Sequence, residues 1–171
     1  MAGWLENVTP QVIAGIVWTA TIVALLACWK VATLRSWTMK VDLRYLLLLH
    51  LTRLVGFYFL FLSSRGQLPF AFAAPAGAGD IIVALLAFLL LILSDARNWT
   101  VLIIWNTIGL TDILFVVLLA LRLGLADRQS MHALREFPLS LLPTFLVPLI
   151  IVSHVLIFVR AAVAPKRAGQ R

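Results

Sequence analysis

The sequence predicts an all-α integral membrane bundle of five transmembrane helices, with the N-terminus outside and the C-terminus inside. Of the 171 residues, 63% are hydrophobic and only 12% are charged, whereas soluble domains are about half apolar and a quarter charged. Several apolar runs approach or exceed the roughly 18–20 residues needed to cross ~30 Å of hydrocarbon. Because a soluble fold of this size leaves much of its surface exposed, a lipid bilayer is the expected solvent.

The five expected spans follow from the apolar runs and the polar segments between them. The third and fourth are joined by the brief connection DARNWT and are expected to be antiparallel neighbours, and the segment ADRQSMHALREF before the fifth predicts a turn or a short interfacial helix. Two prolines in the first half of the fifth span, at positions 143 and 148, are expected to kink it. The spans run from Gln11 to Leu34, Arg44 to Ser64, Asp80 to Ser94, Thr100 to Leu123, and Pro138 to Val163.

A short irregular loop is predicted between the second and third spans. The segment FAFAAPAGAGD contains Pro75, Gly77 and Gly79, all of which disfavour a helix. Irregular backbone at membrane depth is tolerated only where it is buried in protein or lines a cavity. A re-entrant or interfacial loop is therefore expected, and Asp80 is then placed to cap the third span by accepting hydrogen bonds from its free amides.

The distribution of Lys and Arg predicts the orientation and excludes a nucleic-acid partner. The net charge of +7 sits at the ends of apolar runs and not over one face, which is typical of loops that contact anionic lipid. Nine basic residues fall on one side and four on the other, so the richer side is expected to be cytoplasmic. The inner set is Lys30, Arg35, Lys40, Arg44, Arg97, Arg160, Lys166, Arg167 and Arg171; the outer set is Arg65, Arg122, Arg128 and Arg135.

The domain organisation is expected to be simple. Residues 1–163 are predicted to form a single transmembrane domain and residues 164–171 a basic cytoplasmic tail. Residues 1–10 carry no Lys or Arg, unlike a cleavable signal peptide, which begins with a basic region. We therefore expect the first span to be retained. The single cysteine, Cys28, excludes an intrachain disulfide and a cysteine-cluster metal site.

Four ionisable residues fall inside the predicted spans, where charge is expensive and usually functional. They are His50, Arg53, Asp112 and His154. Arg53 is expected near the bilayer centre, and Asp112 is the acid at comparable depth, so the two are predicted to form an ion pair. The pair is interpreted either as a structural device that fixes helix register, or as a gate, a proton or ion relay, or a clamp on a haem propionate.

The two histidines are expected to lie at matching depths. His50 follows Arg44 by six residues and His154 precedes Arg160 by six, which places both roughly 9 Å inside the same leaflet at ~1.5 Å per residue. Two imidazoles at one depth predict a bis-histidine haem site in an apolar pocket. The alternative interpretation is that each histidine only makes a hydrogen bond across helices; zinc is less favoured, since no third ligand is evident. Residues expected to pack the macrocycle are Phe57, Phe61 and Phe158.

The fourth span carries a small and polar stripe in the sequence WNTIGLTD. Asn106 and Asp112 flank Gly109 by about 60° on either side of the helix, which allows a neighbouring helix to approach closely. With Arg53 and Asp80, these residues form the predicted polar core. Trp105 is expected to pack or to face lipid. No catalytic residues are predicted, and no enzymatic activity has a positive sign.

A family resemblance rests on three segments in the same order: RLVGFYFLFLSSRGQLPFAFAAPAGAGDI at 53–81, WNTIGLTD at 105–112 and PTFLVPLIIVSH at 143–154. Together they resemble a group of small, uncharacterised bacterial integral membrane proteins. The resemblance implies a bacterial inner membrane and a compact helical fold, but no activity. It also implies that the group's recurring motifs include the residues Arg53, Asp80, Asn106, Asp112 and His154; His50 is not among them.

Three functional hypotheses follow. The first is a membrane haem b protein for electron transfer or sensing, ligated by His50 and His154, with Arg53 beside the cofactor. The second is an ion- or solute-translocating carrier or channel-like protein that uses Arg53 and Asp112. The third is an accessory subunit without chemistry of its own, acting in a homo-oligomer or a larger membrane complex.

Overall fold

The computed structural model describes residues 8–93 and 98–163, and in these ranges the chain is helical with short turns and no strand. Five helical segments are long and apolar enough to cross a membrane, which confirms the predicted all-α bundle with five candidate spans. The predicted basic tail lies outside the described residues, and the N-out orientation stays a prediction. The five segments are Pro10–Lys30, Leu43–Ser64, Phe70–Ile92, Trp99–Ala126 and Leu142–Val163.

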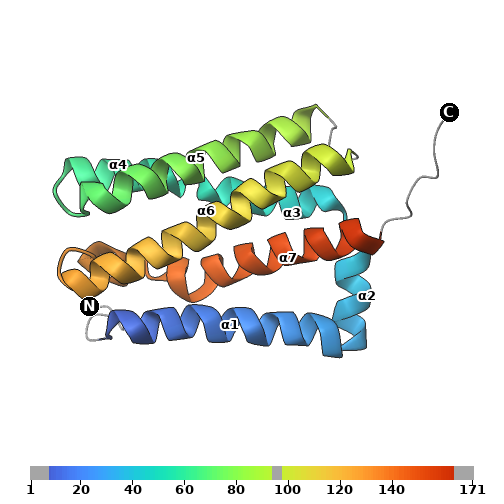
Figure 1. The fold of residues 1–171 in the computed structure, drawn as a ribbon, viewed down its shortest axis with the longest axis horizontal. Coiled ribbons are helices and arrows are strands. Elements are labelled where there is room, and N and C mark those ends of the chain that lie inside the picture. The colour runs from blue at the N-terminus through green and yellow to red at the C-terminus, as the bar shows by residue number, and fades with distance from the viewer. Residues whose placement is uncertain (1–7, 94–97, 164–171) are drawn as a thin grey trace.

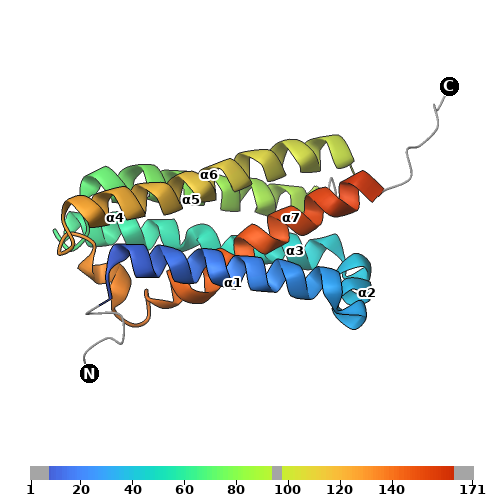
Figure 2. The ribbon, with the colours of Figure 1, turned by 60° about the horizontal axis from the view of Figure 1, so that its bottom comes forward.

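The spans lie roughly parallel along the length of the molecule (Figures 1 and 2). Helix α5 (Phe70–Ile92) packs against the second span on one side and against α6 (Trp99–Ala126) on the other. Helix α6 in turn packs against α7 (Val147–Val163), and α1 (Pro10–Lys30) covers α7 from the outside of the bundle. The third and the last spans are the most enclosed by the rest of the protein and the first is the least, so residues that must avoid lipid are expected away from α1.

The second span is a helix with a tighter middle. It begins with α3 (Leu43–Leu49), which Asp42 caps by accepting from the amide of Arg44 at 2.9 Å. The 3₁₀ segment η1 (His50–Val55) follows, and α4 (Gly56–Ser64) completes the span. A 3₁₀ turn within a helix often marks a functional or strained position, and here it holds both His50 and Arg53.

The prediction of an irregular loop in the segment FAFAAPAGAGD is wrong. Helix α5 begins at Phe70 and continues through Pro75 and the glycines to Ile92. In hydrocarbon every backbone amide must find a partner within the segment, and this requirement outweighs the poor helix propensity of Gly and Pro. Asp80 is therefore the eleventh of 23 residues in α5 rather than the cap of a helix.

The remaining differences concern the ends of the spans. The polar connection after the first span is itself a helix, α2 (Ala32–Lys40), which runs across the end of the bundle (Figure 1). The turn before the last span contains the short 3₁₀ helix η3 (His132–Arg135), as predicted. The last span opens with the π-helix η4 (Leu142–Leu146), which includes Pro143. The proline there is accommodated by a wider turn of helix.

The apolar core is divided along the length of the bundle. One buried cluster includes Phe72 and Ala76 of α5 together with Val116 of α6. A second includes Val83 of α5 and Trp105 of α6. The stretches of α5 and α6 between these clusters carry the polar residues, so the polar centre lies at the middle of the spans.

Candidate functional site

A buried ion cluster joins three spans at the middle of the bundle. Arg53 is 1% exposed, and its guanidinium contacts α5 and α6 together. Nε donates to Asp80 Oδ1 at 2.7 Å, Nη1 donates to the carbonyl oxygen of Gly109 at 3.0 Å, and Nη2 donates to Asp112 Oδ2. The predicted Arg53–Asp112 ion pair is confirmed. Asp80, expected in the polar core and at the cap of a helix, is a second acidic partner of Arg53.

The local backbone directs Arg53 and His50 to the same side. In a 3₁₀ helix, residues i and i+3 are eclipsed, and these two residues stand at that spacing within η1. Both side chains are consequently buried against α5, α6 and α7. The tight segment thus turns two costly polar groups away from lipid and into the bundle.

The ion cluster contains two acids and one base. Asp80 and Asp112 both contact Arg53, and no other Lys or Arg forms a salt bridge with either acid among the described residues. With both carboxylates ionised, the cluster would carry one excess negative charge in the middle of the apolar bundle. An unpaired buried charge costs several kcal/mol, roughly 3–5 when one partner of a buried pair is removed. A neutral cluster therefore needs one more cation, and the smallest is a proton on one of the two carboxyl groups.

Two glycines let the helices approach closely enough to form the site. A Cβ at Gly79 would overlap the carboxylate of Asp112, and a Cβ at Gly109 would lie 2.6 Å from Cε1 of His154. The predicted stripe of Asn106, Gly109 and Asp112 on the fourth span does face a neighbouring helix. Glycine at these two positions is therefore explained by packing, because a larger residue would collide with a neighbouring helix.

A second polar cluster contains both predicted histidines. His50 and His154 are fully buried, and their ring centroids are 4.3 Å apart with a tilt of 48°. The expected common depth of the two rings is therefore accompanied by direct contact. The edge of Trp105 meets His50, with ring centroids 4.8 Å apart, and its indole Nε1 donates to the carbonyl oxygen of Val83 at 3.1 Å. Trp105 packs inside the bundle and does not face lipid.

The hydrogen bonds fix the proton positions on both imidazoles. Asn106 Nδ2 donates to the carbonyl oxygen of His154 at 3.0 Å, so its Oδ1 is the acceptor for His154 Nδ1 at 2.8 Å. Ser153 Oγ donates to the carbonyl oxygen of Ile150 at 2.7 Å and accepts from His50 Nε2 at 3.0 Å. Each neutral imidazole has one N–H and one lone pair. His154 therefore keeps its lone pair on Nε2, and His50 keeps its lone pair on Nδ1.

Both lone-pair nitrogens are buried and have no hydrogen-bond partner among residues 8–93 and 98–163. A buried acceptor without a partner is uncommon and costs about 1–3 kcal/mol. Such atoms are where a metal ion, a proton or a water molecule binds. Among the described residues, no group of three or more His, Cys, Asp or Glu is arranged to hold a metal ion. A metal ion bound by His50 and His154 would therefore have two ligands from this part of the chain.

The ring contact bears on the predicted haem. Axial ligation places the two imidazoles on opposite faces of the macrocycle, with metal–nitrogen bonds of about 2 Å each by analogy with other imidazole ligation. His50 and His154 touch each other, so a porphyrin does not fit between them in this packing. Phe57 and Phe61, expected to pack the macrocycle, are 57% and 49% exposed and point away from the core.

Sequence reasoning left three contacts of the site unpredicted. Asp80 was expected in the polar core, but as the cap of a helix and not as a partner of Arg53; Trp105 was expected to pack or to face lipid; and no contact was predicted for Ser153. Ser153 directly precedes His154 in the chain, but its hydroxyl contacts His50 on another span. The resemblance already implied a place for Asp80 in the recurring motifs, and that was the available signal.

One family model matches a range of the chain that includes the whole site. A family model described as a domain of unknown function, DUF8737, matches residues 10–162. Searches of curated proteins and of solved structures found no match. The matched range includes all five candidate spans and every residue of both polar clusters, and it agrees with the resemblance to an uncharacterised family. The chain belongs to the DUF8737 family.

Proposed function

We propose that this protein is a multi-pass carrier of the bacterial inner membrane, which exchanges one proton, held by the cluster of Asp80, Arg53 and Asp112, for one cation. One observation supports the proposal above the others. Two carboxylates share a single guanidinium at mid-span, and acids at this depth commonly serve as proton relays in pumps and transporters.

Charge balance supplies the chemical step. In the resting state one carboxyl holds a proton, and the cluster of two acids and Arg53 is neutral. Loss of that proton leaves one negative charge, which makes the binding of a cation favourable. The cluster can therefore alternate between a protonated form and a cation-loaded form without ever burying a net charge, which is the energetic requirement for a carrier in hydrocarbon.

Asp112 is the acid favoured as the exchange point. Its side chain is 16% exposed, whereas that of Asp80 is 6% exposed. Both acids accept a charge-assisted hydrogen bond from Arg53, Asp80 from Nε at 2.7 Å and Asp112 from Nη2, so exposure and not the arginine contact distinguishes them. The acid that is less enclosed by other residues is the favoured point of exchange.

Proton flux in reconstituted liposomes tests the proposal. Liposomes with a trapped pH dye are loaded with sodium or potassium and diluted into buffer without that cation, so that its outward movement drives proton uptake by exchange. We expect wild-type protein to acidify the lumen and Asp112→Asn to fall to the rate of protein-free liposomes. Glu136→Gln is the matched control, because Glu136 is an exposed acid outside the cluster. Equal flux in wild type, in Asp112→Asn and in empty liposomes would contradict the proposal.

A second candidate function is haem b binding through His50 and His154. The two lone-pair nitrogens without partners favour it, since a neutral imidazole is a common iron ligand. The contact between the rings opposes it, because the helices carrying them would have to separate. The spectrum described in the Discussion distinguishes this candidate from the carrier.

A further inference from the structure

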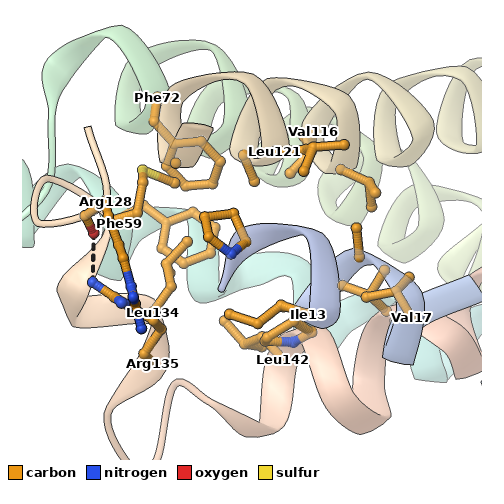
Figure 3. Close-up of a pocket in the computed structure, with 18 residues that line it drawn as sticks. Ile13, Val17, Phe59, Phe72, Val116, Leu121, Arg128, Leu134, Arg135 and Leu142 are labelled. Carbon is orange, nitrogen blue, oxygen red and sulfur yellow. Dashed lines mark hydrogen bonds between the residues drawn. The ribbon is translucent and has the colours of Figure 1, made fainter. Parts of the chain in front are cut away.

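The apolar pocket at the end of the bundle is not a site for a cation. Figure 3 shows its walls of aliphatic and aromatic side chains, with Arg128 and Arg135 together at one end. The charged side chains that line it are therefore cations, and none of the three residues of the ion cluster lines it. Hard cations prefer oxygen ligands, carboxylates above all. In the described part of the bundle interior, these ligands are the carboxylates that contact Arg53.

The charge of the ion cluster selects the charge of the cation. Two ionised carboxylates and one guanidinium sum to one negative charge. One proton or one monovalent cation brings this sum to zero. A divalent cation would leave one positive charge without a partner, which is strongly unfavourable in an apolar interior. The cluster therefore favours a monovalent cation over Mg²⁺ or Ca²⁺.

Each acid keeps one oxygen for a further ligand. Arg53 binds Oδ1 of Asp80 and Oδ2 of Asp112. The other oxygens, Oδ2 of Asp80 and Oδ1 of Asp112, accept no hydrogen bond from residues 8–93 and 98–163. An ionised carboxylate has about four lone-pair sites on its two oxygens. A cation can therefore bind the cluster while Arg53 keeps both of its acidic partners.

The packing around the two acids favours a small cation. A Cβ at Gly56 would lie 3.1 Å from Cβ of Asp80, and a Cβ at Gly79 would overlap the carboxylate of Asp112. The acids are thus enclosed by helix backbones, which yield less readily than flexible side chains. Carboxylates also exert a stronger field than the neutral carbonyl oxygens of potassium filters. Limited space and a strong field each favour Na⁺ over K⁺.

A buried nitrogen beside the cluster lacks a hydrogen-bond donor. His154 is fully buried, and its Nε2 has no partner in the described part of the chain. A Cβ at Gly109 would lie 3.0 Å from this Nε2, and the carbonyl oxygen of Gly109 accepts from Arg53 Nη1 at 3.0 Å. The lone pair therefore lies against the residue that also holds Arg53, three positions before Asp112 on α6. A water molecule carried by a bound cation supplies the missing donor.

We propose that the exchanged cation is Na⁺, bound by the carboxylates of Asp80 and Asp112 with one water that donates to Nε2 of His154. Resting on the proposed carrier function, this assignment names its substrate. In the exchange, the O–H bond of the protonated carboxyl breaks, the proton passes to water, and Na⁺ takes its place on the carboxylate. The charge of the cluster is zero before and after, so one Na⁺ exchanges for one proton without net movement of charge.

Proton release from the detergent-purified, full-length protein tests the binding step. The protein is kept in weak buffer with a pH dye, and NaCl, KCl or choline chloride is added at equal concentration. We expect NaCl to release one proton per protein at saturation and the other two salts to release a small fraction of it. Asp80→Asn and Asp112→Asn are each expected to abolish the release, because Arg53 and one acid are already neutral. Glu136→Gln, which removes an exposed acid outside the cluster, is the matched control.

The water ligand has its own test in the same assay. His154→Phe removes the lone pair, and we expect the NaCl concentration for half-maximal release to rise about fivefold, as the loss of one hydrogen bond predicts. His132→Phe is the matched control, because His132 is 38% exposed and lies outside the cluster. An unchanged NaCl concentration in His154→Phe would remove His154 from the proposed site.

Liposomes separate the choice of cation from the carrier function. We expect an outward Na⁺ gradient to acidify the lumen and an equal outward K⁺ gradient to acidify it much less. With equal K⁺ on both sides, valinomycin is expected to leave the Na⁺-driven rate unchanged, because the exchange moves no net charge. Equal rates with Na⁺ and K⁺, or equal proton release by all three salts, would overturn the assignment of Na⁺ and leave the carrier standing. Rates no higher than those of protein-free liposomes with either cation would overturn both.

Discussion

Arg53 and Asp80 are 27 positions apart in the chain, yet Nε of Arg53 lies 2.7 Å from Oδ1 of Asp80 at the centre of the bundle. This contact links η1 to the middle of α5. Asp112 binds the same guanidinium from α6, so one side chain holds three spans in register. The cluster is therefore both the structural centre of the bundle and its most polar point.

Removal of the guanidinium is expected to destabilise the bundle severely. Arg53→Ala leaves two carboxyl groups buried without their cation, and breaking a buried ion pair in this way costs about 3–5 kcal/mol. Thermal unfolding of detergent-purified protein measures the loss. Arg53→Lys keeps the charge but not the fork of donors, so we expect an intermediate effect. Wild-type stability in Arg53→Ala would show that the cluster contributes nothing to folding.

The two acids are expected to be strongly non-additive. Because one carboxyl already carries a proton in the proposed neutral cluster, Asp80→Asn or Asp112→Asn alone leaves Arg53 with one anionic partner. Asp80→Asn together with Asp112→Asn leaves the buried guanidinium without any, and we expect a cost of about 3–5 kcal/mol. A double-mutant cycle on unfolding free energies gives the coupling. Additive losses would mean that both carboxylates are ionised and act independently on Arg53.

The close approach of α5 to α6 predicts a position-specific effect of a single methyl group. Gly79→Ala places Cβ against the Asp112 carboxylate, so Asp112 must leave Arg53 or the helices must separate. We expect a clear loss of thermal stability and of proton flux. The matched control is Gly15→Ala on α1, where a Cβ meets nothing within 4 Å and helix propensity favours alanine by about 0.5–1 kcal/mol. Equal behaviour of the two variants would contradict the packing at the site.

The contact between the imidazoles predicts the optical spectrum. Since His50 and His154 touch, we expect protein expressed with added haem to show no Soret band after purification. Absorption spectroscopy of the detergent-solubilised protein measures this directly. A Soret band that disappears in both His50→Ala and His154→Ala would establish the haem and show that the two rings separate.

Much of the architecture follows from the sequence because hydrocarbon imposes few choices. Apolar length predicted the five spans, and the cost of a bare guanidinium predicted that Arg53 meets Asp112. The continuous helix through Pro75 was missed, because propensities measured in water underestimate how strongly lipid enforces backbone hydrogen bonds. Because Asp80 was expected at the end of a helix, its hydrogen bond to Arg53 at mid-span was not predicted. The hydrogen bond between Ser153 and His50 depends on how the second and last spans pack together, which a single sequence does not specify.

Infrared difference spectroscopy of the purified protein measures the proposed proton most directly. A protonated, buried carboxyl group has a carbonyl stretch that shifts on exchange into D₂O and is distinct from ionised carboxylates. We predict one such band in wild type, at a pH where free aspartate is ionised, and its loss or displacement in Asp112→Asn but not in Glu136→Gln. A wild-type spectrum in which both Asp80 and Asp112 are ionised at that pH would contradict the neutral cluster.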